Sequence, residues 1–418
     1  MNILIKSAKL VAPNNSSLHL KKRDIHIKNG KIASIAPRIS VENGLRTIER
    51  DNLHVSLGWF DSGVAFGEPG FEERETLHHG LDVAGKSGFT EILLNTNTHP
   101  TPDSSSNIVF LKERGANKST ILHPLGNVTV KSEGEALAEL YDMHQAGAVG
   151  FYDFKSPLAN ANLLKIALQY AQNFDGLVFS YPMDVQIKGK GVAHEGIIST
   201  RLGLKGIPAL AEELQIARDL FILEYTGGKL HIPTISTSGS VKLIAEAKKK
   251  GLNVSCSVAV HNLLLTDGSL EEFDSHFKVL PPLRTVKDIK ALKKGILDGT
   301  IDFVTSDHTP LDVEEKRIEF DNAGYGTLGL ETAFGALNMV FGFEKTIELL
   351  TTGRSRFQLK EPKWEEGVFA NFTLFDPNEE FVFKEEHVIS TSKNSAFLGQ
   401  KLQGRVYGII NNGKVTLK

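Results

Sequence analysis

A single cysteine, Cys256, is present in the 418-residue chain, so the sequence excludes an intrachain disulfide and a zinc site built from cysteine thiolates. No stretch approaches the ~20 consecutive apolar residues that a membrane-spanning helix needs. Residues 1–6 alternate like a strand and lack the long apolar segment of a secretory signal. The formal net charge is −3, without a long run of one sign, which argues against nucleic-acid binding. We therefore expect a cytoplasmic protein that binds neither membrane nor nucleic acid.

The two ends of the chain are rich in strand patterns and hairpin turns. Predicted strands cover residues 3–10, 24–28, 31–35, 369–375 and 406–410. Asn29-Gly30 and Asn412-Gly413 are typical of tight hairpin turns. Neither end is large enough for a good core of its own. The sequence therefore predicts a small composite β-sandwich made by residues 1–53 and 365–418.

Between the ends, short apolar runs alternate with amphipathic helical stretches. The runs cover residues 54–61, 89–95, 120–124, 150–153, 177–181, 229–232, 253–258 and 303–307. A helix is predicted over residues 132–146, opened by a capping box of Ser132 and Glu135, and Pro208 stands where the first turn of another helix begins. Such alternation predicts a parallel sheet, and its repetition predicts an α/β fold, a closed (β/α)8 TIM barrel over residues 54–364. An open doubly wound sheet is less favoured, because no glycine-rich phosphate loop follows the first strand.

Working residues of such barrels lie at the carboxyl ends of the strands. In this chain those positions, with their immediate successors, are Asp61, Asn95, Asp153, Tyr181, His231 and Asp307. They are the candidate site residues.

Several ordered segments resemble the dihydroorotase family of cyclic amidohydrolases. They include residues 58–62, 67–70, 195–208, 226–232, 261–267, 281–285, 306–310 and 329–332. The resemblance implies two zinc ions at the barrel mouth and a bridging hydroxide that attacks an amide carbonyl of a dihydropyrimidine ring. It implies that Asp307 is the proton shuttle, that Asn95 contacts substrate and that Asp153 is the fourth-strand carboxylate. Asp61 would orient the first strand, while His231 and His308 match residues outside the metal shell.

The positions that hold zinc in the family are changed here. Gly63 and Ala65 replace the two first-strand imidazoles, Tyr181 replaces the fifth-strand histidine, and Thr234 replaces the liganding histidine of the sixth strand. Three family residues at the substrate site are also replaced, by Gly67, Leu280 and Leu311. Two surviving carboxylates make a poor zinc site, because zinc sites normally use at least one histidine or cysteine. We therefore expect no metal cofactor.

Two rival metal sites stay open. His123, at the end of the third strand, could form a weak mononuclear site with Asp153 and Asp307. Lys155 could be carboxylated and bridge two ions, although a plain surface lysine is the preferred interpretation. Tyr181 and Leu280 are expected to fill part of the cavity.

Three functional hypotheses follow from the resemblance. The preferred one is a catalytically inactive, dihydroorotase-like protein of pyrimidine biosynthesis that acts as a scaffold or activator for aspartate transcarbamoylase. The second is an active dihydroorotase or related cyclic amidohydrolase with a rearranged zinc site. The third is a metal-independent binder of a small molecule around Asn95, Asp153, Tyr181 and Asp307. A homodimer is expected by the same analogy.

Overall fold

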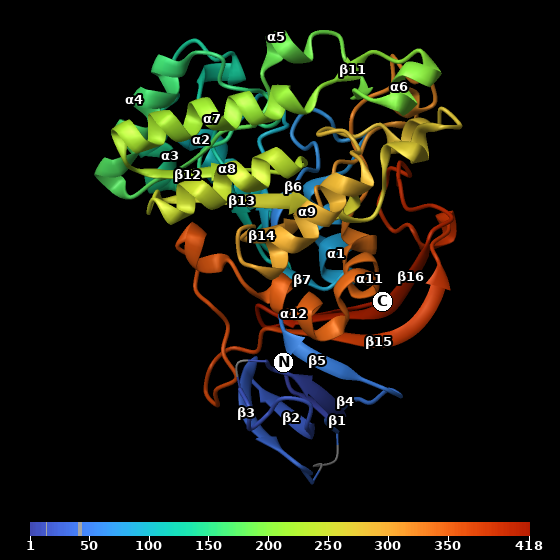
Figure 1. Cartoon of the computed structure of the whole chain (residues 1–418). Helices are drawn as coiled ribbons and strands as arrows, with labels where there is room; N and C mark the ends of the chain where they lie inside the picture. Colours follow the sequence, from blue (N-terminus) through green and yellow to red (C-terminus); the bar gives the residue numbers. More distant parts are fainter. Residues whose placement is uncertain (14, 41–43) are drawn as a thin grey trace.

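The computed structural model describes residues 1–13, 15–40 and 44–418. A (β/α)8 barrel makes up the larger part, and a sheet with strands from both ends of the chain lies beneath it in Figure 1. No helix within the described ranges is long and apolar enough to cross a membrane.

The sheet from the chain ends has the strand order β17-β16-β15-β5-β1-β2-β3, with β4 paired to β1. Its strands are β1 (Ile3–Val11), β2 (Lys22–Lys28), β3 (Lys31–Ala36), β4 (Arg46–Ile48), β5 (His54–Leu57), β15 (Phe372–Val382), β16 (Lys401–Asn411) and β17 (Lys414–Leu417). Residues of both turns, Asn29-Gly30 and Asn412-Gly413, have positive φ angles, as a tight hairpin between twisted strands requires. Since β5 pairs with both β1 and β15, the two ends share one core, as the sequence predicts.

The barrel is built from parallel strands that pair in sequence order. They are β6 (Trp59–Val64), β7 (Phe89–Leu94), β8 (Ile121–Pro124), β9 (Leu177–Phe179), β12 (Lys229–Ile232), β13 (Val254–Ala259) and β14 (Phe303–Thr305). Phe151 forms single parallel bridges to Gly126 and Val178 and so occupies the fourth strand position. A parallel bridge between Val64 and His308 joins the last strand segment to the first and closes the barrel.

Helices surround these strands on the outside (Figure 1). The longer ones are α1 (Leu77–Lys86), α2 (Ser105–Arg114), α3 (Leu140–Ala146), α4 (Ala161–Ala171), α7 (Ala209–Thr226), α8 (Ser238–Lys249), α9 (Val286–Leu297), α11 (Leu330–Phe341) and α12 (Phe343–Thr351). Shorter pieces are α5 (Val185–Lys188), β10 (Ala193–His194), α6 (Ile197–Leu202), β11 (Gly206–Ile207) and α10 (Val313–Lys316). Phe60, Leu93, Phe179 and Phe303 pack together in one buried cluster, so the barrel interior is a packed core rather than a pore.

Three predicted elements differ in the structure. The run 54–61 is two strands, because the chain passes from the end sheet into the barrel at Gly58. A Cβ on Gly58 would lie 1.9 Å from Asn371 Oδ1, so only glycine fits this crossing. The run 150–153 forms two isolated bridges through Phe151 rather than a strand. The helix predicted over 132–146 begins only at Leu140. Ser132 has a left-handed φ of 58° and accepts a hydrogen bond from Asn127 Nδ2, so it does not cap a helix.

Candidate functional site

The barrel mouth is crossed by an ion pair between the loops that follow the fourth and eighth strand positions. Lys155 Nζ lies 2.9 Å from Asp307 Oδ2, and the two side chains are only 11% and 5% exposed. Both residues have left-handed backbone, with φ of 54° and 49°. Burial raises the pKa of Asp307, and the charge of Lys155 opposes that rise. The prediction that Lys155 is a surface lysine is therefore wrong, because its side chain lies inside the mouth. The left-handed conformation of this loop residue has no signature in the sequence pattern.

Asp61 joins the first barrel strand to the last. Its Oδ1 accepts hydrogen bonds from Thr305 Oγ1 at 2.6 Å and from Gly63 N at 3.0 Å, and its Oδ2 accepts one from Ser306 N at 3.1 Å. Burial raises the pKa of this carboxyl to about 6, although the donors around it act in the opposite direction. The structure thus places Asp61 at the closure of the barrel.

Asp153 holds the loop that follows the third strand. Its Oδ1 accepts from Val128 N at 2.9 Å and from Thr129 N at 3.1 Å, while Oδ2 accepts from Thr129 Oγ1 at 2.5 Å. Burial raises its pKa to about 6. Both of its oxygens are therefore already bonded to the protein.

Asn95 lies beside the position of the first missing imidazole. The amide nitrogen Nδ2 would be 3.8 Å from a Cβ on Gly63, and Thr305 Oγ1 would be only 2.9 Å from that same Cβ. Ala65, the second position, is fully buried. The replaced first-strand positions are therefore closely packed by neighbouring groups rather than left open.

Tyr181, Thr234 and His261 bring polar atoms to the mouth that have no hydrogen-bond partner among the described residues. Tyr181 is 1% exposed, and burial, followed by the nearby Tyr152 and Asp307, raises its pKa. Burial, followed by the charges of Lys155 and Lys316, lowers the pKa of His261 to about 3, so the ring is neutral. His261 was not among the candidates predicted from the sequence. It lies just after the seventh barrel strand, β13, so the rule that working residues lie at the carboxyl ends of the strands could have identified it.

His231 lies in the aromatic core beneath the mouth. Its Nδ1 is 2.9 Å from Ser255 Oγ, and its ring centroid is 4.7 Å from that of Phe179. Burial lowers its pKa well below the ordinary value, so the ring is neutral.

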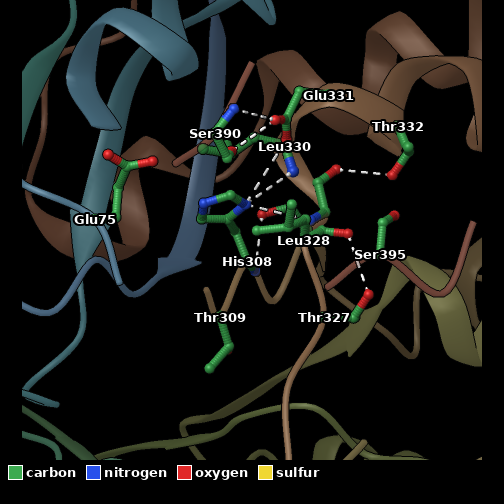
Figure 2. Close-up of polar contacts among 12 residues, drawn as sticks. Glu75, His308, Thr309, Thr327, Leu328, Leu330, Glu331, Thr332, Ser390 and Ser395 are labelled. Atoms are coloured by element: carbon green, nitrogen blue, oxygen red, sulfur yellow. Dashed lines mark hydrogen bonds and ion pairs between the residues drawn. The ribbon is translucent and has the colours of Figure 1, made fainter. Parts of the chain in front are cut away.

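His308 lies at the start of α11. Its Nδ1 accepts the backbone N–H groups of Gly329 at 3.2 Å and Leu330 at 3.4 Å. Figure 2 shows this ring facing the first residues of α11, while Glu331 is turned towards Ser390, whose Oγ donates to it at 2.6 Å. Burial lowers the pKa of His308. The side chain therefore stabilises a helix start.

His123 does not join Asp153 and Asp307. Its Nε2 lies 2.9 Å from Glu91 Oε2, and the other oxygen of Glu91 accepts from Arg354 Nε at 2.9 Å. Arg354 also donates to the carbonyl of Gly58, which precedes the first barrel strand, so this cluster lies towards the amino ends of the strands. Within residues 1–13, 15–40 and 44–418, no group of three or more His, Cys, Asp or Glu side chains could hold a metal ion.

The side chains at the mouth do not fit the zinc centre that the family resemblance implies. The imidazole positions carry Gly63 and Ala65, and Thr305 lies against the first of them. Asp153 is bonded to backbone and hydroxyl donors, and Asp307 is paired with Lys155. Zinc needs several free nitrogen, sulfur or oxygen donors in one compact shell. The described residues do not assemble such a shell at the mouth.

Sequence comparison decides the family. A family model described as "Dihydro-orotase-like" matches residues 54–240. A dihydroorotase of Pelotomaculum thermopropionicum is 37% identical over 425 residues, which cover 100% of this chain and 99% of the relative. The chain belongs to the dihydroorotase family. A second dihydroorotase, from Carboxydothermus hydrogenoformans, is 37% identical over 97% of the chain and 95% of its own length.

Solved structures support the same fold for this dihydroorotase-family chain. An L-hydantoinase (dihydropyrimidinase) from Arthrobacter aurescens superposes with a TM-score of 0.85 at 22% identity, covering 100% of this chain and 96% of the other. A D-hydantoinase gives a TM-score of 0.81 at 20% identity. The predicted barrel with its terminal β unit is therefore confirmed, and the identity to these two structures is too low to say more than fold.

Proposed function

We propose that this dihydroorotase-family protein serves pyrimidine biosynthesis without a zinc-activated hydroxide, as a scaffold or activator rather than as a hydrolase. The ion pair of Lys155 and Asp307 carries the proposal. In the family, the eighth-strand aspartate must accept and release a proton at the substrate. In this chain, Asp307 is buried and is bonded to an ammonium group 2.9 Å away, and the described residues bring no set of metal-ligating side chains beside it.

The partner that we propose is aspartate transcarbamoylase, the enzyme that precedes dihydroorotase in the pathway. This choice rests on the family, some of whose members associate with that enzyme. An inactive barrel that keeps the family's fold over its whole length could still present the surfaces that such an association uses.

The test of this role is an assay of aspartate transcarbamoylase from the same organism, alone and with the full-length protein. The scaffold role predicts co-elution in size-exclusion chromatography and a changed carbamoyl-aspartate rate. Because the proposed role needs no chemistry at the mouth, Asp307→Asn should act as well as the unmodified protein. The absence of both co-elution and a rate change would exclude this partner.

A second candidate function is an active dihydroorotase, and the names of the relatives favour it over an inactive scaffold. Activity requires donors that the mouth does not bring together, because His123 is bonded to Glu91 instead. Hydrolysis of dihydroorotate by the purified protein, abolished in Asp307→Asn, would establish this candidate and reject the first.

A third candidate is a metal-independent binder of a small polar molecule. The unpartnered atoms of Tyr181, Thr234 and His261 favour it, because buried polar groups normally have partners and a ligand could supply them. A rise in melting temperature with dihydroorotate or carbamoyl aspartate, absent in Tyr181→Phe, would support it; a binder at 100 times its Kd adds about 2.7 kcal/mol.

A further inference from the structure

A cavity of about 360 Å³ lies outside the barrel mouth, beside the loop that follows the eighth strand position. One wall comes from α10 and the residues before it, and another comes from residues 391–398 near the end of the chain. The described residues that line it include none of the candidate residues at the mouth. Its volume lies in the range of small-molecule sites, roughly 300–1,000 Å³. The cavity is therefore a separate place where a ligand could bind.

Two lysines beside this cavity are buried, although an ammonium group is costly to bury. Lys278 and Lys316 are both 2% exposed. Lys316 Nζ donates to the carbonyls of Ser275 at 2.7 Å and of Lys278 at 3.0 Å. Lys278 Nζ donates to the carbonyls of Phe320 and Asp321, at 2.6 and 2.9 Å. In the part of the chain that the structure describes, neither ammonium group forms an ion pair. Since buried charges in proteins are normally paired, this region has an unbalanced positive charge.

The carboxylates whose charges act on Lys316 are bonded to other side chains. Asp274 Oδ1 lies 2.7 Å from His276 Nδ1. Glu315 Oε1 lies 2.5 Å from Arg74 Nη2. Neither carboxylate is therefore a direct partner for the buried ammonium group.

The surroundings of Lys316 disfavour its charged form. Burial lowers the pKa of Lys316 to about 7, and the charges of Lys278 and Lys155 act in the same direction. Asp274 and Glu315 act in the opposite direction but do not restore the ordinary value. An anion in the cavity would favour the protonated form, because an opposite charge nearby raises the pKa of an ammonium group. Binding of an anion should therefore take up a proton near neutral pH.

The cavity offers cationic hydrogen-bond donors. An ammonium group has three N–H donors, and only two of those on Lys316 have an acceptor among the described residues. Lys316 lines the cavity, so its third donor is available to a ligand there. Arg317 also lines the cavity, is exposed, and forms no ion pair within the described chain. A guanidinium group fits carboxylate or phosphate oxygens with two parallel bonds. These two residues can therefore donate to an oxyanion.

The acidic residues that line the cavity are exposed or already bonded. Glu73 and Glu385 are exposed, so water screens their charges. Asp312 accepts from Val313 N at 2.5 Å and so caps the start of α10. The buried charge of Lys316 is screened much less and dominates the interior of the cavity.

The cavity also has apolar side chains, and its two walls are bonded to each other. Leu311, Val313 and Leu398 line it. Asn394 joins the walls, because its Oδ1 accepts from Leu311 N and its Nδ2 donates to the carbonyl of Thr309, both at 3.1 Å. A site that is already formed avoids the cost of ordering side chains when a ligand binds. This lining fits a ligand with a short apolar body next to its anionic group.

We propose that this cavity binds a small organic anion. The carboxylate or phosphate oxygens of the anion accept hydrogen bonds from Lys316 and Arg317, and its apolar part packs against Leu311. The site is separate from the barrel mouth, and the proposal does not depend on the proposed function.

The first test is isothermal titration calorimetry of the full chain at neutral pH and fixed ionic strength. The three probes share one aromatic ring and differ in charge: phenyl phosphate, benzoate and the neutral benzyl alcohol. At least one of the two anions should bind at least about tenfold more tightly than the alcohol. The anion that binds identifies the anionic group as phosphate or carboxylate. Binding of neither anion, or equal binding of all three probes, would overturn the proposal.

The second test assigns the binding to Lys316. Lys316→Met should weaken anion binding at least about tenfold and abolish the proton uptake, which is measured in buffers of different ionisation enthalpy. Lys287→Met, at an exposed position of α9, is the matched control and should change neither. His276 is the histidine that lines the cavity, and His276→Gln should leave the proton uptake in place. Proton uptake that persists in Lys316→Met would contradict the assignment.

A further variant separates loss of the site from misfolding, which circular dichroism of each variant reports. Val313 is exposed and lines the cavity, so Val313→Trp should fill the cavity while both cationic groups stay in place. This variant should block anion binding. Glu314→Trp, at the neighbouring exposed position that does not line the cavity, is the control and should bind as the unmodified protein does. An anion that binds Val313→Trp as tightly as the unmodified protein would show that it binds elsewhere and would reject the proposal.

Discussion

Lys155 and Asp307 meet across the barrel mouth at 2.9 Å, joining the loops after the fourth and eighth strand positions in a nearly solvent-free ion pair. Burial alone would favour a neutral Asp307, and the neighbouring ammonium favours the carboxylate. The pair therefore joins the two loops at the mouth by a direct contact between two buried side chains.

Removal of Lys155 should destabilise the protein in a pH-dependent way. Lys155→Met leaves Asp307 buried without its partner, which costs about 3 kcal/mol near pH 8. The pKa of Asp307 then rises further above its unfolded value, so the loss should shrink as the pH falls and the carboxyl is protonated. Urea unfolding of the unmodified protein and of Lys155→Met at pH 5 and pH 8 measures this loss of stability. The exposed Lys242→Met on α8 serves as the control and should show no such difference.

Asp61 should make stability fall as the pH rises from about 4 to about 6. Its pKa is raised by burial from 3.8 to about 6, so the folded state binds more protons than the unfolded state in this window. The contribution is present below pH 4 and is lost as the pH rises through 6, by at most about 3 kcal/mol. The test is the free energy of unfolding of the unmodified protein and of Asp61→Asn, measured across pH 4–7. The difference between the two should change with pH between about 4 and 6. A flat difference would show that Asp61 titrates normally in the fold.

His261 should make the stability of the protein fall as the pH decreases, which is opposite to the effect of Asp61. Its folded pKa is lowered from 6.5 to about 3, mainly by burial, so the unfolded state binds a proton that the folded state does not. Stability from this group is present above pH 6.5 and falls progressively as the pH decreases towards 3. His261→Gln should lose stability less steeply between pH 6.5 and 4.5 in the same unfolding assay. An unchanged acid slope would contradict the buried, neutral ring.

Gly58 should not tolerate a side chain. A Cβ there would lie 1.9 Å from Asn371 Oδ1 and 2.2 Å from Thr90 Oγ1, where the chain crosses from the end sheet into the barrel. Gly58→Ala should cost about 2 kcal/mol or more through displaced neighbours. Gly196→Ala is the control, since the nearest side-chain atom there is 3.5 Å away. Equal melting temperatures for the two variants would refute the tight crossing.

The sequence supports much of this fold because the strand pattern and its repetition are local properties. The terminal hairpins were predictable from Asn29-Gly30 and Asn412-Gly413, whose residues tolerate positive φ. The predicted helix start at Ser132 was wrong, because the left-handed backbone of Ser132 and its bond with Asn127 depend on the tertiary fold.

The candidate site was only partly predictable. Asp61, Asn95, Asp153 and Asp307 could be predicted to lie at or near the mouth. They stand at the carboxyl ends of predicted strands, and a parallel barrel brings those ends together. The partner of Asp307 could not be found in this way, because Lys155 lies in a loop whose left-handed turn has no pattern in the sequence. The pairing of His123 with Glu91 also depends on a contact between strands that composition does not reveal.

The proposed function depends on a barrel mouth that holds no zinc centre and does not hydrolyse dihydroorotate. The most direct measurement is the zinc content of protein purified from zinc-supplemented medium, with dihydroorotate ring opening and closure assayed on the same sample. The dihydroorotase of Pelotomaculum thermopropionicum, prepared identically, is the control. We expect less than about a tenth of an equivalent of zinc and no turnover, since the residues that the structure describes assemble no compact donor shell. One or two equivalents of zinc with turnover that Asp307→Asn abolishes would contradict the account.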